Sequence, residues 1–177
     1  MKVKDVMVGV VKTCSANDDL NRAAQIMWEN DCGIVPVVEA DEYLIGLITD
    51  RDACMAAYTQ GRPLNEIRVG DVMSRNVKAC RPDEDASVLS AAMRSLRVRR
   101  VPVVDALGRL VGIVSLSDLA RRAAADRGPG NKNLDSVTET LASVCHPANS
   151  PVVNSSPPPL PEVAAKVEAV LRPQRAR

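Results

Sequence analysis

Two hydroxyl–carboxylate pairs with identical spacing are the residues of this chain best suited to bind a ligand. Thr49 is followed three residues later by Asp52, and Ser115 is followed three residues later by Asp118. Each pair comes after an apolar run and is expected to open a helix. A single pair of this kind indicates a capping box, in which the hydroxyl and the acid satisfy amide groups at the start of the helix.

The recurrence of the pair favours a ligand site over a cap alone. Gly46 and Gly112 each stand three residues before the hydroxyl, and glycine lets a ligand approach the backbone closely. Free amide groups at a helix start favour phosphate. A carboxylate one turn later is placed to accept hydrogen bonds from the two hydroxyls of a ribose. The pattern therefore suits a nucleotide.

Three arginines add a second candidate feature. Arg97, Arg99 and Arg100 precede an apolar run in the second half of the chain. They form either a solvated face or a phosphate site, for which the guanidinium fork is well shaped. The equivalent positions of the first half carry Asp31, Gly33 and Ile34.

These features belong to an internal duplication. Residues 3–54 recur at residues 69–120 with a constant offset of 66 and no gap, and both copies contain the run VPVV, at residues 35–38 and 101–104. A long period that occurs twice indicates a pseudo-symmetric pair that shares a core. Each half alone is too small to bury much surface, so we expect the halves to stabilise each other and to form related clefts.

Within each half the pattern predicts strand, helix, strand, strand, helix. Residues 10–13 and 76–79 are the expected first strands. Acidic residues 17–19 and 83–85 open the first helices, whose apolar stripes place Met27 and Trp28 in the core. A hairpin follows, with strands at residues 34–38 and 44–48 in the first half. The last helices begin just after Thr49 and Ser115.

The predicted domains are residues 1–61, residues 62–126, a short helical extension at 127–147 and a proline-rich tail at 148–177, which we expect to be flexible. Residues 162–171 of this tail could form a small helix, and the chain ends in basic residues.

Composition argues against several classes of function. The formal net charge is +1, from 23 basic and 22 acidic residues, and aromatic residues make up 2% of the chain. A near-neutral chain has no global attraction to nucleic acid, and single-strand binding needs aromatic stacking platforms. No apolar run reaches the roughly 18 residues of a membrane span, and a cytoplasmic location is expected.

Cysteine and histidine offer no metal site in the sequence. The five cysteines form no CxxC pair, and their odd number argues against a disulfide framework. Cys14 and Cys80 are expected to be small buried apolar residues. His146 is the one histidine and lacks a second imidazole nearby, so we predict no metal.

The chain resembles a tandem pair of cystathionine-β-synthase (CBS) domains, a Bateman module. The motifs are Asp-Val-Met at residues 5–7 and 71–73, the two VPVV runs and the doubled Gly-x-x-[Ser/Thr]-x-x-Asp turn. The resemblance covers residues 1 to about 124. It implies an α/β fold of α+β type, with two βαββα repeats packed about a pseudo-twofold axis, a disc-like homodimer and clefts that bind AMP, ATP or S-adenosylmethionine.

The resemblance also implies roles for individual residues. Asp52 and Asp118 would hold ribose, and Thr49 and Ser115 would hold phosphate. The remaining residues implied are Arg99 and Arg100 as a basic pair, Ser117 as a further polar contact, and, ranked lower, Val11, Thr13 and Val77 near adenine. Because Gly33 and Ile34 depart from the basic pattern, the first site is expected to be weaker, empty or filled from the other half.

The leading hypothesis is a regulatory module, not an enzyme, that binds an adenine nucleotide (AMP, ADP or ATP) and requires no cofactor. Nothing in the sequence offers a nucleophile–base pair. Its expected partners are the nucleotide, a second copy of the chain and an unidentified protein effector. The alternative is a dimerisation scaffold without a ligand, whose tail docks a partner. A weaker third hypothesis is an enzyme or nucleic-acid regulator that acts through the basic tail.

Overall fold

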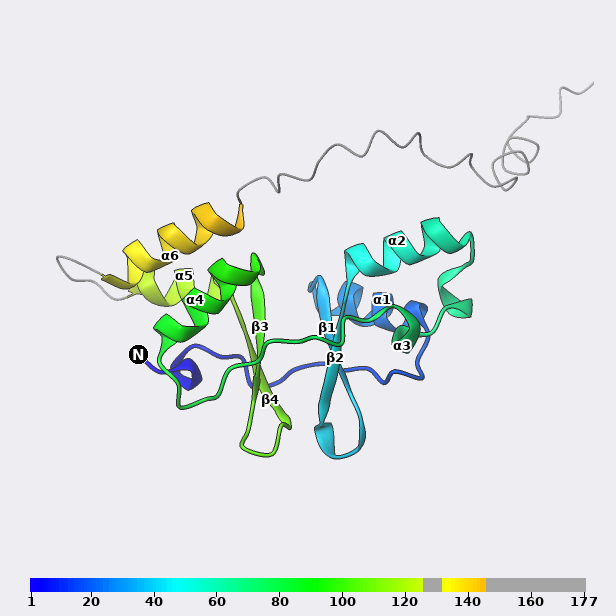
Figure 1. The fold of residues 1–177 in the computed structure, drawn as a ribbon, viewed down its shortest axis with the longest axis horizontal. Coiled ribbons are helices and arrows are strands. Elements are labelled where there is room, and N and C mark those ends of the chain that lie inside the picture. The colour runs from blue at the N-terminus through cyan, green and yellow to red at the C-terminus, as the bar shows by residue number, and fades with distance from the viewer. Residues whose placement is uncertain (126–131, 146–177) are drawn as a thin grey trace, which may run out of the picture. The chain divides into compact units, whose positions relative to one another are not determined.

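The computed structural model describes residues 1–125 and 132–145 (Figure 1). Its α-helices and strands are, in chain order, α1 Leu20–Glu29, β1 Ile34–Val38, β2 Leu44–Thr49, α2 Asp50–Gln60, α3 Val69–Val72, α4 Ala86–Leu96, β3 Arg100–Val104, β4 Leu110–Ser115, α5 Leu116–Ala125 and α6 Lys132–Val144. Three short 3₁₀ turns complete the set, η1 Val3–Asp5, η2 Ala40–Glu42 and η3 Leu64–Glu66. This is the mixed helix and strand architecture expected of a CBS pair.

The two hairpins have the same register. In the first half Ile34 pairs with Thr49, and in the second half Arg100 pairs with Ser115. Both hairpins are antiparallel and have an irregularity at the same place, between the last two valines of the first strand. The register places the start of one strand opposite the residue that opens the following helix.

The predicted first strand of each half is wrong as a strand. Residues 10–13 and 76–79 are not in strands, and only Cys14 and Cys80 make single parallel bridges, to Val37 and Val103. The amide of Cys14 donates to the carbonyl of Pro36 at 3.1 Å. The next rung of a parallel ladder needs an amide hydrogen at residue 36, which proline lacks. Pro102 ends the second bridge in the same way.

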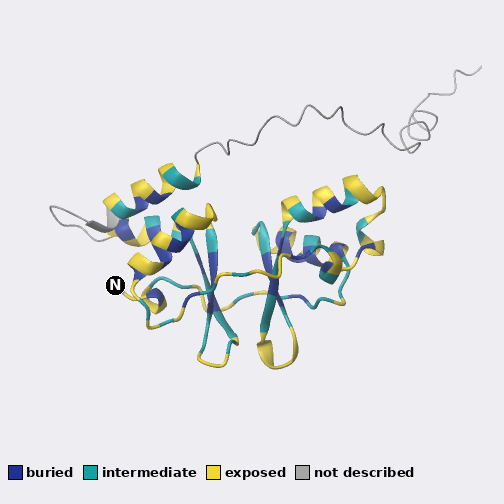
Figure 2. Ribbon diagram, viewed as in Figure 1, coloured by how far each residue is buried: buried dark blue, intermediate teal, exposed yellow. Residues whose placement is uncertain are grey.

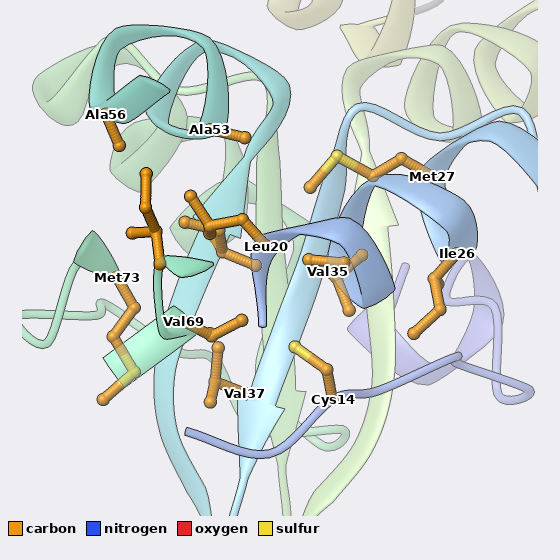
Figure 3. Packing of buried hydrophobic residues seen from close by; sticks show 13 residues of the cluster. Cys14, Leu20, Ile26, Met27, Val35, Val37, Ala53, Ala56, Val69 and Met73 are labelled. Carbon is orange, nitrogen blue, oxygen red and sulfur yellow. The ribbon is translucent and has the colours of Figure 1, made fainter. Parts of the chain in front are cut away.

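Each half completes its core with residues from the start of the other. Ile67, Val69 and Met73 belong to the first core, with Leu20 and Val35, as Figure 3 shows for the last four. In the second core the corresponding residue is Val3, which is fully buried. The dark blue positions of Figure 2 mark these interiors. The domain boundary between residues 61 and 62 stays a prediction, and core residues from both sides of it pack together.

Backbone pairing also crosses between the halves. Ser74 exchanges two hydrogen bonds with Leu47 of β2, and Val8 exchanges two with Ile113 of β4, all at 2.9–3.0 Å. Gly46 and Gly112 make this approach possible, because a Cβ at either would lie within 2.8–2.9 Å of a methionine sulfur and 3.0–3.1 Å of a carbonyl oxygen. The glycines therefore make room for the protein itself. Their predicted role for ligand approach is wrong.

One core prediction fails in α1. This helix buries Leu20, Ala23, Ile26 and Met27, whereas Trp28 is 88% exposed. The buried face runs through Ile26, so Trp28 lies at its edge. Cys14 and Cys80 are buried as predicted. Burial raises the pKa of Cys14 to about 12, and burial followed by the nearby Glu84 raises the pKa of Cys80 to about 11.

The helix α6 confirms a predicted helical extension. It packs against α4 and α5 (Figure 1), where Val137 joins the second core. Arg94 of α4 donates to Thr140 at 3.3 Å and pairs with Glu139 at 3.6 Å. The predicted tail at residues 148–177, with its possible helix at 162–171, lies outside the described residues.

Candidate functional site

Both hydroxyl–carboxylate pairs form capping boxes. The amide and hydroxyl of Thr49 donate to Oδ2 of Asp52 at 3.0 and 2.7 Å, and the amide of Asp52 donates back to Oγ1 of Thr49 at 3.2 Å. Ser115 and Asp118 repeat the arrangement at 2.8, 2.6 and 3.2 Å. All four residues are half-buried. The capping interpretation is therefore correct in both copies.

The remaining oxygen of the two carboxylates differs. Oδ1 of Asp118 accepts from Arg121 of the same helix. Among the described residues, the hydrogen bonds that the carboxylate of Asp52 accepts involve Oδ2 alone. Asp52 thus retains an oxygen that could accept from a ligand hydroxyl, whereas both oxygens of Asp118 are in use.

The start of α2 does not offer free amide groups to phosphate. The amides of Asp50, Arg51 and Asp52 donate to the carbonyl of Gly33, to Oδ1 of Asp50 and to Oγ1 of Thr49, at 3.3, 2.7 and 3.2 Å. At α5, the amide of Leu116 donates to the carbonyl of Arg99 at 2.8 Å. A phosphate beside α2 would therefore be bound by side chains, and the predicted amide cradle is wrong there.

A cleft of about 500 Å³, here called the Thr49 cleft, lies between the halves. Its walls are residues 49–51 at the start of α2, residues 76–78 before α4 and residues 96–100 between α4 and β3. The volume is within the range of about 300–1,000 Å³ typical of small-molecule sites. The predicted residues that it brings together are Thr49, Val77, Arg99 and Arg100.

A second cleft of about 750 Å³, here called the Ser115 cleft, lies beside it. It is lined by residues 115–117, by residues 31–33, and by Trp28, Val137 and Leu141, among others. Gly33, Asp50, Arg99 and Arg100 border both clefts. The Ser115 cleft thus adds Ser115 and Ser117 to the predicted residues that line a cavity.

Gly33 keeps the boundary of the two clefts open. A Cβ there would lie 2.9 Å from Oδ2 of Asp50 and 3.8 Å from Nη1 of Arg100. The carboxylate of Asp50 from the first half and the guanidinium of Arg100 from the second therefore both lie beside Gly33.

Four of the ten predicted residues do not line either cleft, namely Asp52, Asp118, Val11 and Thr13. The structure instead adds Arg51, Lys78 and Arg97 to the Thr49 cleft. Arg97 stands in the basic run noted in the sequence. Arg51 lies inside the Thr49–Asp52 motif and Lys78 follows Val77, so proximity to predicted residues was the available signal for both.

Two absences hold for the described part of the chain. Within residues 1–125 and 132–145 no group of three His, Cys, Asp or Glu is arranged to hold a metal ion. In the same residues no helix combines the length and the apolar character needed to cross a bilayer.

Comparison with known proteins identifies the family. The model of the CBS domain matches residues 3–58 and 69–125. The CBS domain-containing protein YhcV of Bacillus subtilis is 36% identical over 129 residues, which are 73% of this chain and 90% of YhcV.

Two examples illustrate the solved structures that are similar in fold. Hypoxic Response Protein I, with two coordinated zinc ions, is 31% identical with a TM-score of 0.63, over 68% of this chain and 98% of its own. The CBS domain pair of MJ0100, in complex with 5′-methylthioadenosine and S-adenosyl-L-methionine, is 30% identical with a TM-score of 0.62, over 69% and 98%. With both of its repeats matched, this chain belongs to the CBS domain family.

Proposed function

We propose that this protein is a regulatory module, not an enzyme, that binds an adenosine-containing ligand between its two halves. The ligand is AMP, ADP, ATP or S-adenosylmethionine, and the protein needs no cofactor. Its output is a shift between two arrangements of a homodimer in the cytoplasm, read by a protein effector. The Thr49 cleft carries the proposal, because it joins Thr49 of the first half to Arg99 and Arg100 of the second.

The ligands of a relative support this chemistry. The CBS pair of MJ0100 is in complex with two molecules that contain adenosine. A ligand held between two halves contacts both, so its binding free energy can favour one arrangement of the halves over another. This is the differential affinity that a ligand-driven switch requires.

The proposed contacts follow the chemistry of the side chains. Arg99 and Arg100 bind phosphate as guanidinium forks, and Thr49 supplies a hydroxyl beside them. Asp52, which follows the cleft residue Arg51 but does not itself line the cleft, accepts from ribose through Oδ1, and Val77, which lines the cleft, packs against adenine. The contacts proposed for the second site are Ser115 and Ser117, with Asp118 for its ribose. Val11 and Thr13 are proposed near adenine.

A matched pair of variants tests the ribose contact. Asp52→Asn preserves the shape of the side chain and an acceptor for the cap, but removes the charge. We expect it to weaken binding of the adenosine ligand by about ten- to a hundredfold, the loss of a charge-assisted hydrogen bond of about 1.5–3 kcal/mol. Asp118→Asn is the matched control, with a smaller effect because Arg121 occupies its carboxylate. Isothermal titration calorimetry measures both.

The ligand screen decides the proposal itself. We expect at least one of AMP, ADP, ATP, 5′-methylthioadenosine and S-adenosylmethionine to raise the midpoint of thermal denaturation of the full chain. If none shifts the midpoint or gives heat on titration, the sensor proposal is rejected.

A scaffold without a ligand is the second candidate, and one observation favours it. Asp52 and Asp118 both serve their own helix ends, which accounts for the recurring motif without a nucleotide. The scaffold predicts no response in the ligand screen. It also predicts that deletion of residues 148–177 abolishes capture of a partner while the dimer persists.

A further inference from the structure

The Thr49 cleft carries an excess of positive charge. Among the described residues that line it, five are basic, Arg51, Lys78, Arg97, Arg99 and Arg100, and one, Asp50, is acidic. None of the five basic side chains makes an ion pair or a side-chain hydrogen bond within residues 1–125 and 132–145. A concave site lined by one sign of charge concentrates ligands of the opposite sign.

Comparison of the two repeats shows that the backbone fold does not require basic side chains at these positions. The residues 66 positions away from Arg51, Arg97, Arg99 and Arg100 are Ser117, Asp31, Gly33 and Ile34. Lys78 alone has a basic equivalent, Lys12. The equivalent backbone positions therefore tolerate neutral and acidic side chains, and the four arginines are a property of one cleft.

The Ser115 cleft provides the contrast. It shares Arg99 and Arg100, but Asp31 and Asp50 also line it, so basic and acidic side chains are balanced among its described residues. It also has the apolar contribution of Trp28, Val137 and Leu141. A ligand with little net negative charge suits this cleft better than a polyphosphate.

We infer that the Thr49 cleft selects a ligand with at least two phosphate groups, a nucleoside di- or triphosphate. The inference rests on the proposed function and names the ligand class of one of its sites. The amides at the start of α2 are already paired, so the charge of the phosphates falls to the side chains. Guanidinium forks from two segments, residue 51 at the start of α2 and residues 97–100 between α4 and β3, reach a chain of phosphates better than a single phosphate.

Titration calorimetry with the full chain tests the inference, using adenosine, AMP, ADP, ATP and inorganic tripolyphosphate as probes. Affinity should rise with each phosphate, with ATP bound about tenfold or more tightly than AMP. The preference should decline as salt concentration rises, because salt screens exposed charges.

A double variant identifies the cleft. Arg51→Gln with Arg97→Gln removes two positive charges that line the Thr49 cleft and not the Ser115 cleft. We expect it to reduce ATP affinity by about tenfold or more, with AMP affinity changed much less. Arg68→Gln with Arg81→Gln is the control, since it changes net charge equally at exposed positions outside both clefts. Thermal midpoints without ligand show whether each variant is folded.

The outcomes separate this inference from the proposed function. Equal affinity for AMP and ATP, or an unchanged ATP affinity in the cleft variant, overturns the inference and leaves the adenosine sensor intact. Tripolyphosphate bound as tightly as ATP, with adenosine and AMP unbound, supports a polyphosphate cleft and rejects adenosine recognition. Failure of every probe overturns both. If the control double variant loses as much ATP affinity as the cleft variant, the effect is one of net charge and the inference fails.

Discussion

In the first half β1 pairs with β2, and Ile34 at the start of β1 lies opposite Thr49. In the second half β3 pairs with β4, and Arg100 at the start of β3 lies opposite Ser115. The two registers are equivalent, and both helix starts carry the same cap. The side chains at the equivalent strand starts nevertheless differ, isoleucine in one and arginine in the other. Backbone pairing and helix capping have been kept in both copies, while the cleft charges have not.

The halves also differ in what covers their helices. In the second half α6 lies against α4 and α5. The described residues provide no equivalent cover for α1 and α2, where Ala24, Met27, Ala53 and Ala57 line an apolar hollow of about 480 Å³. An internal repeat thus shows which features the shared fold requires and which belong to one half only.

The largest expected effect tests the part that the halves share. Gly46→Ala and Gly112→Ala each push a Cβ against a methionine sulfur and a carbonyl oxygen of the crossing segment. We expect each to lower the free energy of unfolding by about 1–3 kcal/mol, measured by urea denaturation. Gly9→Ala is the control, because its nearest atom would lie 3.9 Å away. A loss in only one of the pair would show that crossing is tight in one half alone.

A smaller effect tests how α6 is held against α4 and α5 of the second half. Val137 is 9% exposed and packs into the second core, whereas Leu141 of the same helix is 49% exposed. Val137→Ala should cost about 1–2 kcal/mol of unfolding free energy, from about 0.8 kcal/mol per buried methylene. Leu141→Ala should cost less than about 0.5 kcal/mol. Equal losses from the two would mean that α6 is not held through Val137.

The smallest effect compares the two buried thiols. In the folded protein, burial raises the thiol pKa above the ordinary value of 9.0, to about 12 for Cys14 and about 11 for Cys80. Their contribution to stability is complete below pH 9 and declines as pH rises from there, until about 11 for Cys80 and about 12 for Cys14. At pH 9.5 we expect a loss of about 1 kcal/mol or less per thiol.

Urea denaturation at pH 8 and pH 9.5 measures this loss. Cys14→Ala should remove the contribution of one thiol and so reduce the pH dependence, and Cys80→Ala should do the same. Cys54→Ala is the matched control, because its thiol is exposed. A pH dependence that survives replacement of both buried cysteines would have to come from other groups.

Much of the fold was predictable because the signals were local and repeated. The glycine at residue 61 ends α2 in a left-handed conformation, and Thr49 caps the start of the same helix. The first strands were not predictable from β propensity, because a proline in the neighbouring strand limits them to one bridge each. Trp28 was assigned to the core by spacing alone, although the true face of α1 runs through Ile26.

The site was less predictable than the fold. Sequence spacing identified Thr49 and Ser115, which do border clefts, and it also offered the capping boxes that Asp52 and Asp118 form, but it could not decide between a cap and a ligand contact. The meeting of Arg99 and Arg100 with the start of α2 depends on how the halves pack. The sequence left three alternatives for the first site, weaker, empty or filled from the other half, and all three stay predictions, although Arg99 and Arg100 do line the cleft beside Thr49. Whether the residues bind a nucleotide stays a prediction.

The exposed indole of Trp28 has a practical consequence. It is the chain's sole tryptophan, and it borders both the Ser115 cleft and the apolar hollow over α1 and α2. Intrinsic fluorescence excited at the indole band therefore originates from one place on the unlabelled protein. A partner that buries that ring in apolar contacts will blue-shift the emission and shield it from acrylamide quenching, so the protein carries its own optical probe.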